Sequence, residues 1–81
     1  MAMIEVFSSK NCVYCEAAKT LLAEQRLAFQ ELNIAEDAAN LAELRRCLPR
    51  AKSIPQIFVD GDHIGGLEDL QRYLFSPRVP P

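Results

Sequence analysis

Two cysteines with two residues between them, Cys12 and Cys15, are the side chains of this sequence best suited to covalent chemistry. In a reducing compartment, a Cys-x-x-Cys pair indicates redox activity or metal binding rather than a structural disulfide. The pair precedes an expected helix, and the N-terminus of a helix favours an anion. Because this position and the nearby cation Lys10 lower the pKa of a thiol, Cys12 is predicted to be a nucleophilic thiolate. Cys15, one helical turn further on, would then attack the mixed disulfide formed at Cys12.

Metal binding is the main alternative for the same pair, besides two ordinary thiols placed by chance. Cys47 and His63 would complete a zinc-ligand set, but structural zinc sites usually supply their second pair at short spacing and these two are isolated. An iron–sulfur cluster needs four thiolates, so it would have to be shared in a dimer. No metal ligand is assigned. Cys47 is expected to pack as a small hydrophobe, with a regulatory thiol as the alternative, and His63 to be a surface strand residue.

Seven secondary-structure elements are expected to position the cysteine pair, in the order βαβαββα. Runs of β-branched and aromatic residues predict strands, and Ala- and Leu-rich stretches with helical periodicity predict helices. The predicted strands span residues 3–7, 29–34 and 56–59, with a return strand from 63, and the predicted helices span residues 13–24, 38–48 and 67–75. Ser9 or Asn11 is expected to cap the first helix, and Asp60-Gly61 predicts a hairpin turn. The sequence therefore predicts an α/β domain with a four-stranded mixed sheet flanked by three helices.

Length and composition exclude several classes of function. The 81 residues suffice for one hydrophobic core, so we expect a single domain over residues 1–75 and a frayed, proline-rich tail over 76–81. The 9 basic and 11 acidic residues give a net charge of −2 without a basic cluster, which argues against nucleic-acid binding. The sequence has neither the pattern of a signal peptide nor a long apolar run, so we expect no membrane association and a cytoplasmic location.

Three segments in sequence order resemble the motifs of dithiol glutaredoxins. They are Cys12-Val13-Tyr14-Cys15, Ser53-Ile54-Pro55-Gln56-Ile57-Phe58, and Asp60-Gly61-Asp62-His63-Ile64-Gly65-Gly66-Leu67-Glu68-Asp69-Leu70. Together they extend the resemblance from Met3 to about Phe75. The resemblance implies a thioredoxin-like fold and glutathione as a co-substrate, without a metal or an organic coenzyme.

The resemblance also implies a glutathione site beside the dithiol. The backbone of Ile54 would bind the cysteinyl part of glutathione, next to a cis Pro55. Sequence alone would favour a trans proline, because only about 5–6% of X–Pro bonds in folded proteins are cis. Backbone N–H groups after Gly66 would bind the γ-glutamyl carboxylate, as helix N-termini bind anions. Lys10 and Lys52 would lie near the glycine carboxylate, and Tyr14 would line the groove. The residues expected to bind glutathione are Lys10, Tyr14, Lys52, Ser53, Ile54, Pro55, Gly66, Leu67, Glu68 and Asp69.

The implied activity is glutathione-dependent reduction of protein disulfides and of protein–glutathione mixed disulfides by a monomer. The implied partners are glutathione and the disulfide-containing or glutathionylated proteins that it serves. Val13 departs from the proline that is most familiar after the first cysteine of this family. Two alternatives therefore stay open: a dimer that binds a [2Fe–2S] cluster for storage or delivery, and a glutaredoxin-like protein reduced by thioredoxin reductase.

Overall fold

The computed structural model describes residues 2–75 and contains all seven expected elements in the expected order. The strands are β1 (Ile4–Ser8), β2 (Gln30–Asn33), β3 (Gln56–Val59) and β4 (Asp62–Gly65), and the helices are α1 (Val13–Glu24), α2 (Ala38–Cys47) and α3 (Leu67–Phe75). The α/β class and the four-stranded mixed sheet are confirmed. No helix within the described residues is long and apolar enough to cross a bilayer.

The sheet has the strand order β2-β1-β3-β4. β1 is parallel to β2 and antiparallel to β3, and β3 and β4 form the predicted hairpin. Asp60 and Gly61 make its turn with φ values of 52° and 84°, the left-handed geometry for which Asp-Gly is favoured. Because β1 and β3 are antiparallel, with Phe7 opposite Gln56, the end of β1 lies beside the start of β3. The chain after β1 and the chain before β3 therefore meet at one edge of the sheet.

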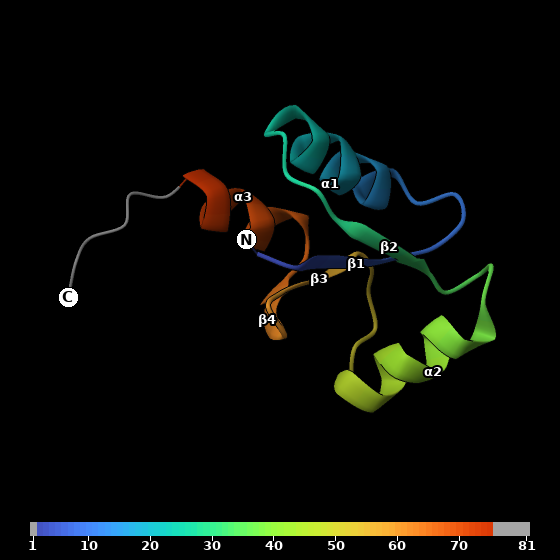
Figure 1. The fold of residues 1–81 in the computed structure, drawn as a ribbon. Coiled ribbons are helices and arrows are strands. Elements are labelled where there is room, and N and C mark those ends of the chain that lie inside the picture. The colour runs from blue at the N-terminus through green and yellow to red at the C-terminus, as the bar shows by residue number, and fades with distance from the viewer. Residues whose placement is uncertain (1, 76–81) are drawn as a thin grey trace.

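The helices form a layer on each side of this sheet, with α1 and α3 on one face and α2 on the other (Figure 1). The alternation along β1 matches these layers: Ile4 and Val6 belong to the core under α1 and α3, whereas Phe7 belongs to the core under α2. Phe7 packs edge to face on Phe58, with the ring centroids 5.8 Å apart. Leu44 is the helical member of this smaller cluster.

The start of α1 differs from the prediction. Cys12 is itself the N-cap: its backbone is extended and its Sγ accepts a hydrogen bond from the Cys15 N–H. Asn11 instead has a φ of 54°, so it reverses the chain just before the helix rather than capping it. The expected cap at Ser9 or Asn11 was wrong because a sulfur atom takes the place of the usual oxygen acceptor.

The remaining differences concern the ends of elements. β1 starts and ends one residue later than predicted, β2 is one residue shorter at each end, and α2 ends one residue earlier. β4 begins at Asp62, one residue before the predicted start. The predicted frayed tail, 76–81, lies outside the described residues.

Candidate active site

The two cysteines of the motif lie at the N-terminus of α1 and are joined in a disulfide, with their Cα atoms 5.2 Å apart. The Cys15 N–H donates to Cys12 Sγ at 3.2 Å, so a backbone donor of the first helical turn points at the sulfur predicted to be the nucleophile. Cys12 is half-buried, whereas Cys15 has no exposed surface. An incoming molecule can therefore reach Cys12 and not Cys15.

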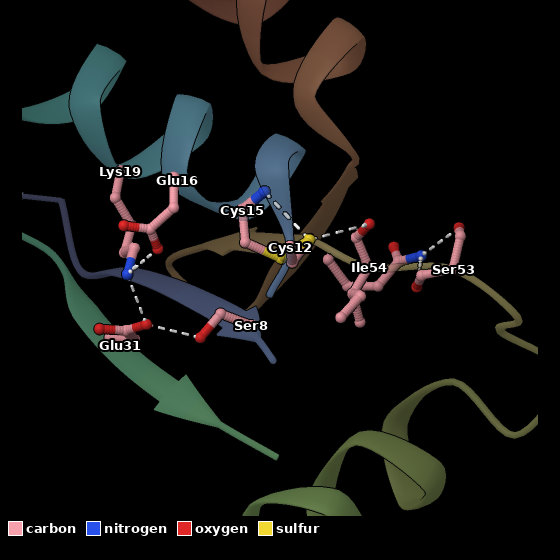
Figure 2. Close-up of a disulfide and its surroundings, with 9 residues drawn as sticks. Ser8, Cys12, Cys15, Glu16, Lys19, Glu31, Ser53 and Ile54 are labelled. Carbon is pink, nitrogen blue, oxygen red and sulfur yellow. Dashed lines mark hydrogen bonds and ion pairs between the residues drawn. A yellow bond between two sulfur atoms is a disulfide. The ribbon is translucent and has the colours of Figure 1, made fainter. Parts of the chain in front are cut away.

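The loop before β3, the strand that pairs with β1, faces this disulfide. The Ile54–Pro55 peptide bond is cis, as the resemblance implied. The Ile54 carbonyl oxygen lies 4.0 Å from Cys12 Sγ, and Figure 2 shows the two groups turned toward each other. The backbone of Ile54 is thus next to the reactive sulfur, in reach of any molecule bonded to it.

A groove of about 630 Å³ opens beside Ile54, a size within the usual range of small-molecule sites. It runs from α1 across the loop before β3 to the start of α3. Its lining residues are Tyr14, Ser53, Ile54, Pro55, Gly66, Leu67, Glu68, Asp69 and Gln71. The groove brings together all the predicted glutathione-binding residues except Lys10 and Lys52. Gln71 was not predicted, because an exposed helical glutamine carries no distinguishing sequence signal.

The N-terminus of α3 forms one wall of the groove. The Gly66 N–H donates to the carboxylate of Asp69 at 3.0 Å, so this side chain caps the helix. The N–H groups of the next residues, Leu67 and Glu68, have no acceptor within the helix. The Glu68 side chain is 82% exposed and pairs with Arg72 at 3.2 Å, so part of its charge is compensated by this cation. The backbone donors here remain suited to an anion.

Lys10 and Lys52 lie outside the groove. Both side chains are exposed, and neither has an ion pair within residues 2–75. Lys52 borders a second, smaller hollow on the side of α2. The structure therefore does not bring these two cations into the wall of the larger groove.

A tether that the sequence did not reveal holds the loop before β3. The buried Gln56 donates from Nε2 to the Ser53 carbonyl oxygen at 2.9 Å, and its Oε1 lies 2.7 Å from His63 Nε2. Since Oε1 can only accept, His63 donates this hydrogen bond. The His63 ring also packs on Phe58, with centroids 5.1 Å apart. His63 is a surface strand residue as predicted, and through Gln56 it supports the groove wall at Ser53.

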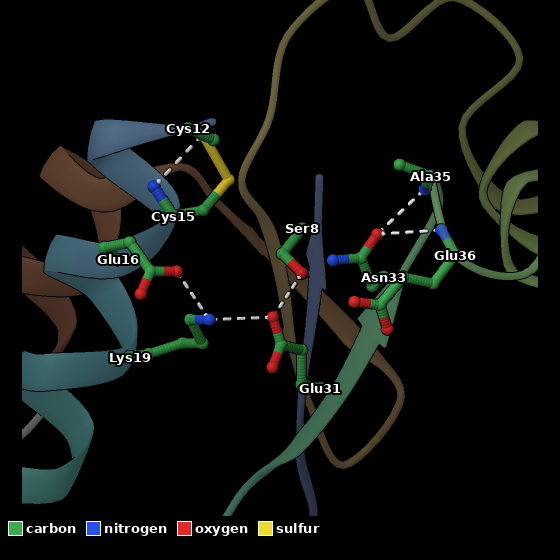
Figure 3. A network of polar contacts seen from close by, with 9 residues as sticks. All are labelled: Ser8, Cys12, Cys15, Glu16, Lys19, Glu31, Asn33, Ala35 and Glu36. Carbon is green, nitrogen blue, oxygen red and sulfur yellow. Dashed lines mark hydrogen bonds and ion pairs between the residues drawn. A yellow bond between two sulfur atoms is a disulfide. The ribbon is translucent and has the colours of Figure 1, made fainter. Parts of the chain in front are cut away.

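A polar network ties α1 to the sheet one helical turn after Cys15 (Figure 3). Lys19 Nζ lies 2.6 Å from Glu16 and 2.8 Å from Glu31, and the buried Ser8 hydroxyl donates to Glu31 at 2.6 Å. The hydrogen bonds from Lys19 and Ser8 lower the pKa of Glu31, while those to Glu16 and Glu31 raise the pKa of Lys19. This network helps to hold the helix that carries the dithiol.

The third cysteine, Cys47, is a free thiol in different surroundings from the disulfide pair. Cys47 is half-buried against the smaller core cluster and lies 3.5 Å from Glu43. Desolvation raises the pKa of its thiol, and the hydrogen bond to Glu43 adds to this effect. Both disfavour a thiolate. Within the described part of the chain, no three His, Cys, Asp or Glu side chains converge as metal ligands would, so the zinc set with Cys47 and His63 is not assembled here.

Comparison with known proteins agrees with this geometry. A model of the glutaredoxin family matches residues 4–64. Glutaredoxin 3 of Escherichia coli strain K12 is 43% identical over 70 residues, which cover 86% of this chain and 83% of that protein.

Solved structures share the same fold. Glutaredoxin 1 from Francisella tularensis, in complex with cacodylate, has a TM-score of 0.75 at 27% identity, over 91% of this chain and 93% of that one. A buckwheat glutaredoxin–glutathione complex has a TM-score of 0.73 at 24% identity, over 88% of this chain and 67% of that one. The thioredoxin-like fold implied by the three motifs is confirmed.

Proposed function

The chain belongs to the glutaredoxin family of thiol–disulfide oxidoreductases, and from this premise we propose that glutathione is the molecule that reduces its dithiol. One observation carries the proposal: Ile54, whose carbonyl lies 4.0 Å from Cys12 Sγ, also lines the groove. A tripeptide lying in the groove would have its cysteine beside Cys12. The buckwheat neighbour, which is a glutathione complex, gives further support.

Each part of glutathione has a proposed contact in this groove. Ile54 pairs through its backbone with the cysteinyl residue, next to Pro55. The N–H groups of Leu67 and Glu68 bind the γ-glutamyl carboxylate, which suits the positive end of α3. Tyr14 covers one side of the bound tripeptide. Lys10 and Lys52 reach the glycine carboxylate from the rim, since both are long, exposed and without an ion pair in the described residues.

The reaction starts with Cys12 as a thiolate, stabilised by the first turn of α1. With a protein–glutathione mixed disulfide, Cys12 attacks the glutathione sulfur, and the substrate sulfur leaves as a thiolate that takes a proton from water. A second glutathione thiolate then attacks the sulfur of the glutathione bonded to Cys12. The products are glutathione disulfide and the restored Cys12 thiolate.

A protein disulfide uses both cysteines. Cys12 bonds to one substrate sulfur and the other leaves as a thiol after protonation. Cys15 then loses its proton and attacks Cys12, so the substrate departs fully reduced and the Cys12–Cys15 disulfide remains. Two glutathione molecules return this disulfide to the dithiol and become glutathione disulfide. The disulfide in the structure corresponds to the oxidised state of this cycle.

The two cysteines are expected to differ in their effect on the two substrates. Cys12→Ser abolishes reduction of both, because no nucleophile remains. Cys15→Ser keeps reduction of a protein–glutathione mixed disulfide and loses reduction of a protein disulfide. Both are measured in a coupled assay that follows glutathione disulfide formation. Equal loss in the two variants on both substrates would contradict this division of roles.

The electron source is tested by offering the same protein either glutathione or thioredoxin reductase. Turnover with glutathione is expected. Turnover with thioredoxin reductase but not with glutathione would contradict the proposal.

The physiological substrates would be glutathionylated and disulfide-containing proteins. We also propose a cytoplasmic location, which is supported by the proposed need for reduced glutathione, since this pool keeps cytosolic thiols reduced.

A further inference from the structure

A second groove, here called the α2 groove, lies between α2 and the loop before β3. Its volume is about 250 Å³. Its lining residues are Ile34, Leu41, Leu44, Arg45, Leu48, Ala51, Lys52, Ser53 and Ile54. Most of these are apolar, two are cations, and no acidic residue is among the described residues that line it.

The α2 groove is continuous with the reactive site. Ser53 and Ile54 line both it and the larger groove, and the Ile54 carbonyl lies 4.0 Å from Cys12 Sγ. Figure 2 shows α2 beneath the chain that carries these two residues. A polypeptide bonded to Cys12 could therefore extend past Ile54 and along α2 without leaving the surface.

Of the two cations of the α2 groove, Arg45 is available for a polypeptide partner, because Lys52 is proposed above to reach glutathione. Arg45 and Lys52 are exposed and have no ion pair within residues 2–75, although the chain as a whole carries a net charge of −2. The next residue of the helix behaves differently: Arg46 pairs with Glu43 at 2.6 Å and borders another hollow. A ligand complementary to the α2 groove therefore carries an acidic group close to an apolar group.

We propose that the α2 groove binds the polypeptide of a disulfide substrate close to its reacting cysteine. It selects an apolar side chain with an Asp or Glu two residues away, because these two side chains lie on the same face of an extended peptide. This inference rests on the proposed function and specifies the substrate class for the dithiol reaction. An extended peptide advances about 3.3 Å per residue, so the side chains two to four residues from the cysteine reach the α2 groove. Its apolar part supplies burial, and Arg45 supplies the charge preference.

The test uses three synthetic peptides, each with one intramolecular disulfide. They differ only at the second and fourth residues on each side of the reacting cysteine, where they carry Leu and Glu (the Leu-Glu peptide), Leu and Lys (the Leu-Lys peptide) or two serines (the Ser-Ser peptide). The wild-type chain is expected to reduce the Leu-Glu peptide with a kcat/KM about three- to tenfold above that for the other two, an effect expected of one ion pair plus a partly buried leucine. Equal rates for the three peptides would overturn the proposal.

A matched pair of variants separates the groove from the overall charge. Arg45→Glu and Arg46→Glu change the net charge equally and lie side by side in the last turn of α2. Arg45→Glu is expected to reverse the preference between the Leu-Glu and Leu-Lys peptides, whereas Arg46→Glu keeps it. If both variants reverse it, long-range charge rather than the α2 groove selects the substrate, and the proposal fails.

Two further readouts exclude other occupants. With the mixed disulfide of glutathione and cysteamine as substrate, both variants should keep the wild-type rate and the wild-type KM for glutathione. A raised KM in Arg45→Glu alone would mean that glutathione itself occupies the α2 groove. A wild-type dimer that Arg45→Glu converts to a monomer on size exclusion would mean that a second copy does. No activity of the wild-type chain on the small substrate would instead refute the proposed function, whatever the peptides show.

Discussion

At the scale of single residues, the start of α3 depends on the absence of a side chain at Gly65. Its φ of 127° is in the region that L-residues with a Cβ rarely adopt, and a Cβ at this position would overlap the carboxylate of Asp69. That carboxylate accepts the hydrogen bond from the Gly66 N–H. Because Gly65 has no side chain, the carboxylate of Asp69 can occupy the space that a Cβ at position 65 would take.

Gly65→Ala is expected to destabilise the protein more than Gly61→Ala does. Both positions have positive φ, which costs an alanine about 1–2 kcal/mol, but only Gly65 has a neighbour in the way of a Cβ. Displacing Asp69 adds the loss of a cap, about 1 kcal/mol. Urea unfolding of both variants measures the difference, and Gly65→Ala should also raise the KM for glutathione. Equal unfolding free energies for the two variants would contradict this account of Asp69.

At the scale of elements, the sequence predicted the order and type of every helix and strand, and its errors in their bounds are one residue at the end of an element. The bounds of α1 and β3 were correct because α1 consists largely of good helix formers, and because β3 starts directly after Pro55 and ends at the Asp60-Gly61 turn. The bounds of β2 were one residue too wide at each end, because the half-buried apolar residues Phe29 and Ile34 continue the alternating pattern although they lie outside the strand.

The site was predicted to a different extent from the elements. Its groove residues came from motif resemblance, because local propensity carries no information about which loops meet. The tether from His63 through Gln56 could not be predicted, since it depends on the irregular register between β3 and β4 near Ile57 and Phe58. The cap at Cys12 depends on side-chain geometry that spacing does not give.

The network between α1 and β2 should make stability depend on pH in the acid range. The pKa of Glu31 is lowered, first by Lys19 and then by Ser8, so its contribution is present above the unfolded value of about 4.5 and is lost as pH falls through the lower folded value. Glu31→Gln is expected to lose about 0.5–1 kcal/mol at pH 7 and to flatten the decline of the unfolding free energy below pH 4.5.

Denaturant unfolding between pH 3 and 7 measures this effect. Glu24→Gln is the control, because Glu24 is exposed and has no ion pair in the described part of the chain. If the curves of wild type and Glu31→Gln stay parallel over this range, Glu31 does not link α1 to the sheet in solution.

At the scale of the whole molecule, the Cys12 sulfur lies between two chain segments that come from helices on opposite faces of the sheet. The chain after β1 belongs to the α1 side, and the chain before β3 continues from α2 on the other. One edge of the sheet can therefore present two grooves to one sulfur, the larger bounded by α1 and α3 and the smaller by α2. If the two proposals hold, glutathione and a polypeptide approach the sulfur from different sides.

The chain is expected to be a colourless monomer when purified without oxygen in the presence of glutathione. Where glutathione disulfide oxidises the pair, Cys15, with its Cα 5.2 Å from that of Cys12, closes a disulfide with Cys12 and so removes the thiolate that a cluster would need. Size exclusion with light scattering gives the mass, and absorbance in the visible range reports a cluster. A brown dimer would contradict this expectation and favour the [2Fe–2S] alternative, for which Val13 in place of proline left room.

The complete burial of Cys15 beside the accessible Cys12 has a consequence for how widely the protein can act. Cys15 displaces the substrate from Cys12 without contacting the substrate itself. The rate of this release step therefore does not depend on the shape of the substrate. Substrates are then selected when they bind, by the residues that surround Cys12. A change in substrate range requires substitutions only on the surface around Cys12. The reaction between Cys15 and Cys12 is the same for every substrate.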